Sequence, residues 1–125
     1  MKVVHTNQAP EAIGPYSQAI IFQGLVFTSG QIAINPATGK VEEASIEGQT
    51  EQVMKNLDAI LTEAGSDLEH IIKTLVFVKD INDFQKFNEA YKKFFPRNPP
   101  ARSTMQVGNF IGDMVIEIEA IAVCK

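Results

Sequence analysis

The chain has 125 residues, which fits one domain of ordinary size and is too short for two hydrophobic cores. Hydrophobic residues make up 45% and charged residues 21%, so the composition predicts a packed globular fold and excludes disordered and low-complexity architectures. The formal net charge is -4 and the 11 basic residues are scattered, which disfavours a nucleic-acid partner. We predict a single domain over residues 1–125.

The sequence gives no sign of a disulfide, a metal site or a membrane anchor. Cys124 is the one cysteine, so an internal disulfide is excluded, and it lacks the companions that a zinc site needs. His5 and His70 have no clustered acidic partners, so we expect no metal. The N-terminus contains no apolar signal region, and no apolar run reaches the ~20 residues of a membrane helix. We therefore expect a cytoplasmic protein without membrane association.

The first half of the chain predicts a hairpin followed by a helix. Residues 15–34 hold two apolar stretches split by Gln23-Gly24, a pattern typical of two strands joined by a tight turn. Residues 35–40 then form a turn segment that contains proline and glycine. Over residues 45–64 the apolar positions recur at three- and four-residue steps, which predicts a helix that ends at Gly65.

The second half predicts a strand, a helix and two more strands. Residues 70–79 have strand character, and a helix opens at Asn82, with Gln85 placed three positions later as in a capping box. Residues 101–107 and 114–123 are the last two strands. The apolar stripe of this second helix consists of Phe84, Phe87, Tyr91 and Phe94. The order of elements predicts an α+β fold with two helices on one face of a sheet.

One face of this sheet has no cover within the chain. Two helices can cover only one face, yet the strand at residues 70–79 carries apolar side chains on both. Alternation places Ile71 with Leu75 and Phe77 on one face, and Ile72 with the alternate valines on the other. A second copy of the chain is the expected cover, because closed homo-oligomers commonly bury a self-complementary apolar patch.

The final strand carries two carboxylates on one face. Alternation leaves one face wholly apolar and places Glu117 and Glu119 together on the other, between apolar neighbours. These charges are either a solvated face that discourages aggregation or a partly buried pair that needs a partner. Arg102, expected on a neighbouring strand, is the natural partner. It either forms a structural salt bridge or faces a pocket that binds an anion.

Two short segments place hydroxyl groups and backbone N–H groups beside glycines. Gly14-Pro15-Tyr16-Ser17-Gln18 and Thr28-Ser29-Gly30-Gln31 let a ligand approach the main chain closely, and neither is a phosphate-binding loop. Tyr16 is either an interface aromatic or a catalytic group. Ser29 has no histidine at a suitable position, so a serine-histidine-aspartate triad is not expected.

The sequence resembles the Rid (reactive intermediate/imine deaminase, or YjgF) family in five segments, which occur in the family's order and spacing and span almost the whole chain. These are residues 12–19 (AIGPYSQA), 28–31 (TSGQ), 76–80 (VFVKD), 100–103 (PARS) and 116–122 (IEIEAIA). The resemblance implies a chorismate-mutase-like subunit with a mixed β-sheet. It also implies a homotrimer whose sheets pack inward and whose ligand sites lie between subunits.

The resemblance further implies hydrolysis of 2-imino acids and their enamine tautomers, such as 2-aminoacrylate released by pyridoxal-phosphate enzymes, to 2-oxo acids and ammonia. No cofactor is implied. Arg102 matches the family arginine that pairs with the substrate carboxylate, and Glu117 matches the acidic residue that deprotonates water. Tyr16 matches a tyrosine near the imine. The matched pocket residues are Ser29, Gly30 and Asn88, together with Thr104, which stands where some members have cysteine.

Two alternatives remain open at this stage. The same cleft could bind a 2-oxo acid and report on it without turnover, although Glu117 is unnecessary for simple anion binding and would repel the ligand. Ribonuclease activity with translation inhibition is attached to some members of the family. The acidic net charge and the absence of a basic stripe disfavour it here.

Overall fold

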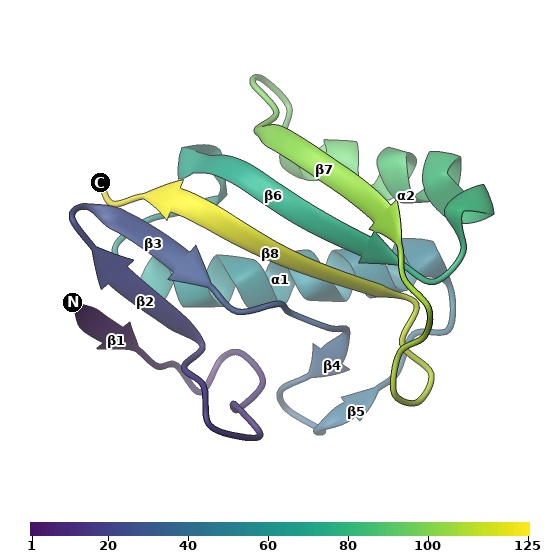
Figure 1. Ribbon diagram of the computed structural model, residues 1–125, viewed down its shortest axis with the longest axis horizontal. Helices are drawn as coiled ribbons and strands as arrows, with labels where there is room; N and C mark the ends of the chain where they lie inside the picture. The colour runs from purple at the N-terminus through teal and green to yellow at the C-terminus, as the bar shows by residue number, and fades with distance from the viewer.

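The structure, a computed structural model, describes residues 1–125 as one mixed sheet with two helices on one face. The sheet has six strands in the order β1-β2-β3-β8-β6-β7, and both helices lie behind it in Figure 1. The predicted α+β fold is confirmed. The strands of this sheet are β1 (Lys2–Val4), β2 (Ala19–Phe22), β3 (Leu25–Thr28), β6 (Ile71–Val78), β7 (Ala101–Gln106) and β8 (Ile116–Val123).

The remaining elements are the helices and a small hairpin below the sheet. The two α-helices are α1 (Ile46–Glu63) and α2 (Phe84–Tyr91). Short 3-10 turns occur at η1 (Leu68–His70), η2 (Ile81–Asp83) and η3 (Lys92–Phe94). The hairpin pairs β4 (Ile34–Asn35) with β5 (Lys40–Val41) around the predicted turn segment. A single cluster of 22 buried hydrophobic residues lies between the sheet and the helices.

The β2–β3 hairpin forms as predicted, at the predicted turn. Gln23 and Gly24 both have positive φ angles, of 50° and 77°. This combination matches a type I′ turn, whose twist suits the right-handed twist of the two strands. Phe22 and Leu25 are the last pair of the ladder.

Helix α1 begins and ends where its sequence signals place it. The Ser45 hydroxyl accepts a hydrogen bond from the Gly48 N–H at 3.0 Å, which caps the first turn. Gly65 has a φ of 79°, and the next N–H, that of Ser66, donates to the Leu61 carbonyl at 2.8 Å. This is the Schellman arrangement, and it confirms the predicted end of the helix.

Strand β8 is the centre of the sheet and has the predicted alternation. It pairs with β3 on one side and with β6 on the other. Its covered face is buried against the helices, and Glu117 and Glu119 lie on the opposite, open face. The buried residues of this strand are Ile116, Ile118, Ala120 and Ala122.

One predicted side-chain orientation in β6 is wrong. Leu75 and Phe77 share a face as predicted, and this face is the open one, but Ile71 is buried and Ile72 is 48% exposed. The register of β6 against β8 shifts between Ile71 and Lys73. Because this bulge adds one residue to the strand, it reverses the faces of the two isoleucines.

The predicted start of the second helix is also wrong. A 3-10 turn precedes α2, and the Asp80 carboxylate caps that turn by accepting the Asn82 N–H at 2.9 Å. No side chain caps α2 itself at Asp83, so Asn82 and Gln85 form no capping box. The apolar stripe is present, with Phe87 and Tyr91 buried.

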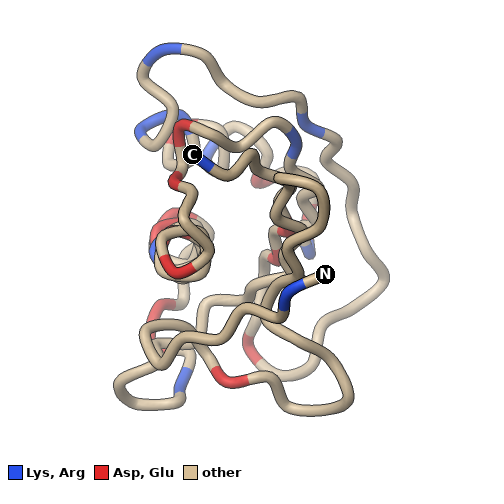
Figure 2. The backbone as a smooth tube through the Cα atoms, turned by 90° about the vertical axis from the view of Figure 1, so that its left-hand side faces the viewer, with Lys and Arg blue, Asp and Glu red and all other residues tan.

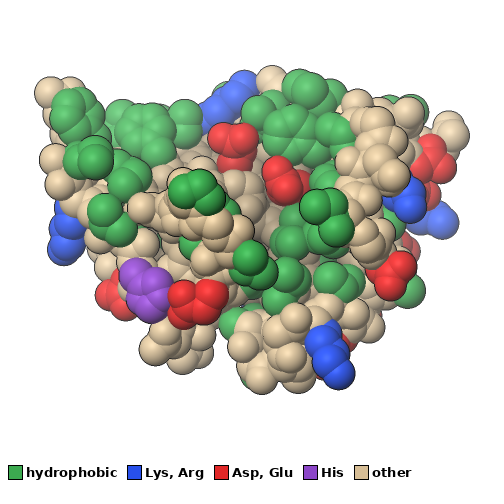
Figure 3. Space-filling model, turned by 60° about the horizontal axis from the view of Figure 1, so that its bottom comes forward, with side chains coloured by type: hydrophobic (Ala, Val, Ile, Leu, Met, Phe, Trp, Pro, Cys, Tyr) green, Lys and Arg blue, Asp and Glu red, His purple; other side chains and the backbone are tan.

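The open face of the sheet is largely apolar. In Figure 2 the α1 helix lies to one side of the sheet only, and hydrophobic side chains occupy much of the surface in Figure 3, with acidic side chains among them. Neither helix is long and apolar enough to cross a bilayer. The apolar residues on the open face are Val3, Ile20, Phe22, Leu25, Phe27, Leu75, Phe77, Met105, Ile121 and Val123.

We predict that Leu57→Ala lowers the free energy of unfolding by about 2 to 5 kcal/mol, because Leu57 is fully buried in the middle of α1 and its truncation leaves a cavity. Lys55→Ala, at an exposed position of the same helix, is the control and should change stability by less than about 0.5 kcal/mol. Denaturant unfolding at one protein concentration measures both. Equal effects of the two substitutions would contradict this packing.

Candidate functional site

The residues predicted for the site form two groups in the folded chain. The acidic half-site consists of Tyr16, Ser29, Gly30 and Glu117, and lies where β3 ends beside β8. The arginine half-site consists of Asn88, Arg102 and Thr104, and lies where α2 packs beside the edge strand β7. The structure therefore brings together the members of each half-site, but it does not unite the two half-sites within one chain.

Glu117 packs directly against Gly30. A Cβ atom at Gly30 would lie 2.5 Å from Glu117 Oε2 and 2.7 Å from its carboxyl carbon. Any larger residue at position 30 would therefore displace the Glu117 carboxyl group from this place. The backbone beyond it is tied to β8 by paired hydrogen bonds between Gln31 and Ile118, at 2.8 and 3.0 Å.

The carboxyl group of Glu117 is held in an environment that favours its protonated form. Burial is the largest cause that raises its pKa above the ordinary value, and the nearby charge of Glu119 raises it further. On the open face, Glu117 pairs with Phe77, and Met105 is the next residue across the sheet. A carboxyl group whose pKa is raised holds its proton to a higher pH than an ordinary glutamate does.

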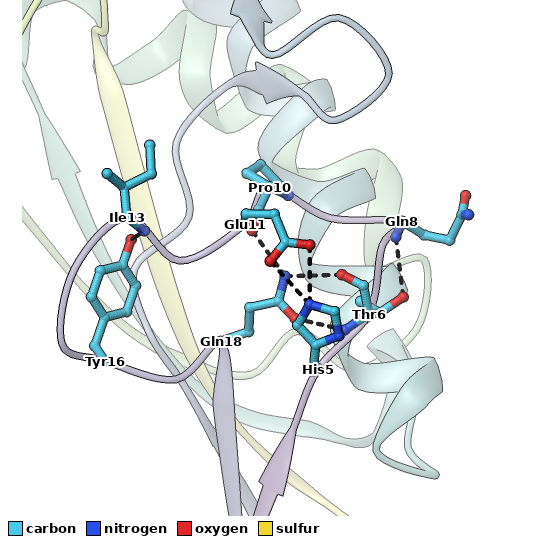
Figure 4. Close-up of polar contacts among 8 residues, drawn as sticks. All are labelled: His5, Thr6, Gln8, Pro10, Glu11, Ile13, Tyr16 and Gln18. Carbon is cyan, nitrogen blue, oxygen red and sulfur yellow. Dashed lines mark hydrogen bonds and ion pairs between the residues drawn. The ribbon is translucent and has the colours of Figure 1, made fainter.

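The loop that carries Tyr16 is fastened to β3 and folded back on itself (Figure 4). The Ser29 hydroxyl donates to the Ser17 carbonyl at 2.6 Å, and the Ser29 N–H donates to the Gln18 carbonyl at 2.9 Å. The Tyr16 hydroxyl accepts the Ile13 N–H at 3.2 Å, and the Tyr16 side chain is 51% exposed. Ser29 therefore positions the loop through its hydroxyl, while Tyr16 lies beside Gly30 at the same small cavity.

Arg102 lies on the opposite side of the sheet from Glu117. Its guanidinium carbon is 5.0 to 5.4 Å from the ring centres of Phe84, Phe87 and Tyr91 on α2. Such distances are those of cation–π contacts, which hold the guanidinium without neutralising it. No carboxylate of the chain lies within salt-bridge distance of Arg102.

Of the two alternatives that the sequence left open for Arg102, the salt bridge with a glutamate of β8 does not form within one chain. Strand β6 lies between β7 and β8, so the two strands that carry these residues are about 10 Å apart. Arg102 pairs with Thr74 of β6, whose side chain is on the helix-covered face, whereas Glu117 pairs with Phe77 of β6, whose side chain is on the open face. Both the intervening strand and the opposite orientations prevent a salt bridge between these two residues within one chain.

The other members of the arginine half-site surround it from two elements. Asn88 is one turn beyond Phe84 on α2, and Thr104 is two residues beyond Arg102 on the same face of β7. The Thr104 hydroxyl oxygen is buried and has no hydrogen-bond partner. Such an atom is uncommon in a folded chain.

Sequence analysis missed the aromatic platform beneath Arg102. Phe84, Phe87 and Tyr91 were assigned to the core because their spacing is that of any buried helical face. The signal that could have identified it is an arginine in an edge strand next to a helix with three such rings. No group of three or more histidine, cysteine and acidic side chains that could hold a metal occurs in the structure.

The fold is an α+β sheet with two helices on one face, and it carries an arginine half-site and an acidic half-site. The family model described as endoribonuclease L-PSP matches residues 6–124. The chain belongs to this family, the Rid or YjgF family, as the sequence resemblance predicted.

Two curated proteins and one crystal structure of this family are similar to the chain over almost its whole length. A Lactococcus lactis protein named as a regulator, AldR, is 52% identical over 125 residues, which cover 100% of this chain and 99% of that protein. The chloroplastic Reactive Intermediate Deaminase A of Arabidopsis thaliana is 49% identical over 121 residues, covering 97% and 65%. The crystal structure of Escherichia coli TdcF with bound serine has a TM-score of 0.94 and 43% identity, covering 100% of both chains.

We predict that Glu117→Gln makes the protein more stable than the wild type at neutral pH. Because the pKa of Glu117 is raised in the folded state, the folded protein binds this proton more tightly than the unfolded chain does. Stability therefore falls as the pH rises from the ordinary value to the raised pKa, and the cost is fully present above it. Glutamine carries no charge and avoids that cost.

The advantage of Glu117→Gln should shrink as the pH falls below the ordinary carboxyl value, where Glu117 is protonated in both states. Denaturant unfolding from acidic to neutral pH measures this difference, with Glu63→Gln, an exposed carboxylate at the end of α1, as the control. A wild type that is more stable than Glu117→Gln at neutral pH would contradict the cause assigned to the raised pKa.

Proposed function

We propose that this protein is a cofactor-independent deaminase that hydrolyses 2-imino acids and their enamine tautomers, such as 2-aminoacrylate, to 2-oxo acids and ammonia. The observation that carries the proposal is the presence of two complementary groups: an Arg102 guanidinium without a carboxylate partner, and a Glu117 carboxyl whose pKa is raised. The 49% identity to a reactive intermediate deaminase supports it. Serine, bound in the TdcF crystal structure, carries the same carboxylate and α-nitrogen as these substrates.

Arg102 binds the substrate carboxylate in this scheme. The planar guanidinium can donate two parallel hydrogen bonds to a carboxylate, and its contacts with the α2 rings limit its freedom before the ligand arrives. Holding the imino acid in one orientation converts a collision between substrate and water into a positioned encounter. Asn88 and the unpartnered Thr104 hydroxyl are the neighbouring polar groups available to the same ligand.

Glu117 moves the proton. It takes one proton from water as the water oxygen bonds to the carbon of the protonated imine, which gives a neutral tetrahedral carbinolamine. Glu117 then returns that proton to the nitrogen, the C–N bond breaks with its electron pair on nitrogen, and the hydroxyl proton passes to ammonia as the carbonyl forms. General acid–base help of this kind typically contributes about 10² to 10⁴-fold. The raised pKa suits Glu117 to both transfers.

A complete site requires a second copy of the chain. The two half-sites are different surfaces of one subunit, so joining the arginine half-site of one copy to the acidic half-site of the next is a head-to-tail contact. Head-to-tail contacts close into rings when the rotation allows it. We propose the homotrimer that the family resemblance implies, with its apolar open faces turned inward and three sites between subunits.

Two other functions are weaker candidates. A regulator that only binds a small carboxylate would use Arg102, but it would gain nothing from the charge of Glu117. A ribonuclease would need a basic surface for the phosphate backbone, whereas the net charge is -4 and Figure 2 shows the basic residues interspersed with acidic ones. The raised pKa of Glu117 favours the hydrolase over both.

We predict that Arg102→Ala lowers kcat/KM for a 2-imino acid by about 100-fold, because hydrogen bonds between charged groups are worth up to about 3 kcal/mol. Arg102→Lys should recover only part, since the ammonium cannot form the paired geometry. Arg97→Ala is the matched control, because Arg97 is exposed and its one ion pair, with Glu69, is 4.0 Å long. The assay generates the imine with an amino-acid oxidase and follows release of the 2-oxo acid.

Full activity of Arg102→Ala would contradict the role given to this guanidinium. A wild type that binds 2-oxo acids tightly and accelerates no imine hydrolysis would contradict the deaminase and favour the regulator.

A further inference from the structure

Thr74 and Tyr91 form a buried polar contact that has no role in the scheme above. Their hydroxyl oxygens lie 2.8 Å apart, which is hydrogen-bond distance. The contact joins the middle of β6 to the last residue of α2. Thr74 is 0% and Tyr91 is 4% exposed, so neither hydroxyl group is open to bulk water. Each of them therefore depends on the other for its hydrogen bond.

These two residues and Arg102 form a closed triangle of contacts. Thr74 is the partner of Arg102 in the parallel ladder between β6 and β7, on the helix-covered face. The Arg102 guanidinium carbon lies 5.0 Å from the centre of the Tyr91 ring, the shortest of its three aromatic distances. The three corners come from β6, α2 and β7, and α2 lies behind this edge of the sheet (Figure 1). A shift of the Tyr91 ring would therefore move a surface that the guanidinium contacts.

Tyr91 is the ring of the aromatic platform that a hydrogen bond ties to the sheet. Phe84 and Phe87 have no polar side-chain atom, so packing alone places them. Tyr91 also packs against Phe87 and Phe95, with ring centres 5.1 and 4.8 Å apart. The hydrogen bond adds a preferred direction to this packing, because it requires an angle as well as a distance. It thereby fixes the ring that lies nearest to the guanidinium of Arg102.

Tyr91 contacts the guanidinium as an uncharged ring. Burial raises the pKa of the Tyr91 hydroxyl above its ordinary value, although the hydrogen bond with Thr74 and the positive charge of Arg102 act in the opposite direction. The hydroxyl group therefore stays protonated at neutral pH. The attraction between Arg102 and this ring is a cation–π contact, which leaves the positive charge in place.

We propose that Thr74 and Tyr91 are positioning residues for Arg102, and that their hydrogen bond fixes the orientation in which the guanidinium meets the carboxylate of the substrate. This inference rests on the proposed function and adds two residues that support the arginine half-site. Neither of them touches the substrate: Thr74 acts on Tyr91, and Tyr91 acts on Arg102. A group that is ordered before the ligand arrives loses less conformational entropy on binding. The pair therefore sets the affinity for the carboxylate rather than the rate of the chemical step.

Two substitutions remove the hydrogen bond from opposite ends. Tyr91→Phe keeps the ring, and Thr74→Val keeps nearly the same size. Each should raise KM for a 2-imino acid about 5-fold and leave kcat within about 2-fold, since one net hydrogen bond corresponds to about that factor. The dissociation constant of 2-oxobutanoate, measured by calorimetry, should rise equally. The double variant should match the single ones, because its second substitution removes no further bond.

The double variant also separates positioning from stability. Either single change leaves one buried hydroxyl group without a partner and should lower the denaturant midpoint, whereas removal of both groups should recover much of that loss. A pair that only stabilised the fold would leave KM at the wild-type value in all three variants. Ser66→Ala is the matched control: Ser66 is 2% exposed, and its hydroxyl donates to the Val123 carbonyl at 2.7 Å at the end of β8. It should lower stability and leave KM unchanged.

The effect should also depend on Arg102. In an Arg102→Ala background, Tyr91→Phe should change kcat/KM by less than about 2-fold, because the group that Tyr91 positions is gone. An equal loss with and without the guanidinium would overturn the proposal.

A further measurement needs no ligand. The Nε–H signal of Arg102 in ¹⁵N NMR spectra can be assigned by its loss in Arg102→Ala. Its heteronuclear NOE should be that of a rigid group in the wild type and in Ser66→Ala, and should fall in Tyr91→Phe and in Thr74→Val.

The possible failures can be told apart. A wild-type KM, or a wild-type NOE of Arg102, in both Tyr91→Phe and Thr74→Val would overturn the positioning role and leave the deaminase intact. Absence of both imine hydrolysis and 2-oxo acid binding in the wild type would overturn the proposed function, and the NOE would still decide whether the pair orders Arg102.

Discussion

The position of strand β6 between β7 and β8 is the constraint on which the site depends. It separates the strand that carries Arg102 from the strand that carries Glu117 and aligns them so that their side chains leave the sheet on opposite faces. A chain with β7 beside β8 could neutralise its arginine with its own glutamate. In this topology the guanidinium stays unpaired on an aromatic platform and the carboxyl group stays protonatable. In the proposed function both groups bind the ligand, and a second chain brings them together.

The open face of the sheet also favours contact with a second chain, because it is apolar. Ten apolar residues lie on it, and monomeric proteins rarely leave a continuous apolar surface of this kind in water. Glu117 and Glu119 lie within that face, and the charge of Glu119 adds to the burial that raises the pKa of Glu117. An assembly that buries the face would therefore stabilise the fold and strengthen the property that suits Glu117 for proton transfer.

The sequence was sufficient for the parts of the fold that local chemistry decides. Gln23-Gly24, Ser45 and Gly65 placed a turn and both ends of a helix, because positive φ angles and capping bonds depend on a few adjacent residues. The alternation of β8 also predicted correctly that its two glutamates share a face. Membership of the Rid family followed from five short segments.

The errors arose where distant parts of the chain decide the outcome. The bulge at residues 71–73 depends on pairing with β8, and the turn before α2 is capped by Asp80, upstream of the predicted cap. The short strands β1, β4 and β5 were missed because two or three residues carry no periodicity. The salt bridge between Arg102 and Glu117 stayed open as an alternative because the last two strands were treated as neighbours, and periodicity does not reveal strand order.

The central claim is that one site takes its arginine and its glutamate from different chains, and mixed assemblies test it most directly. Arg102→Ala and Glu117→Gln chains are each expected to form inactive homo-oligomers, and are unfolded together and refolded. If each site joins two subunits, random mixing restores about a quarter of the sites, those that combine an intact Arg102 with an intact Glu117. Imine hydrolysis should then recover to about a quarter of the wild-type rate. Mixed oligomers that remain as inactive as their parents would contradict the account.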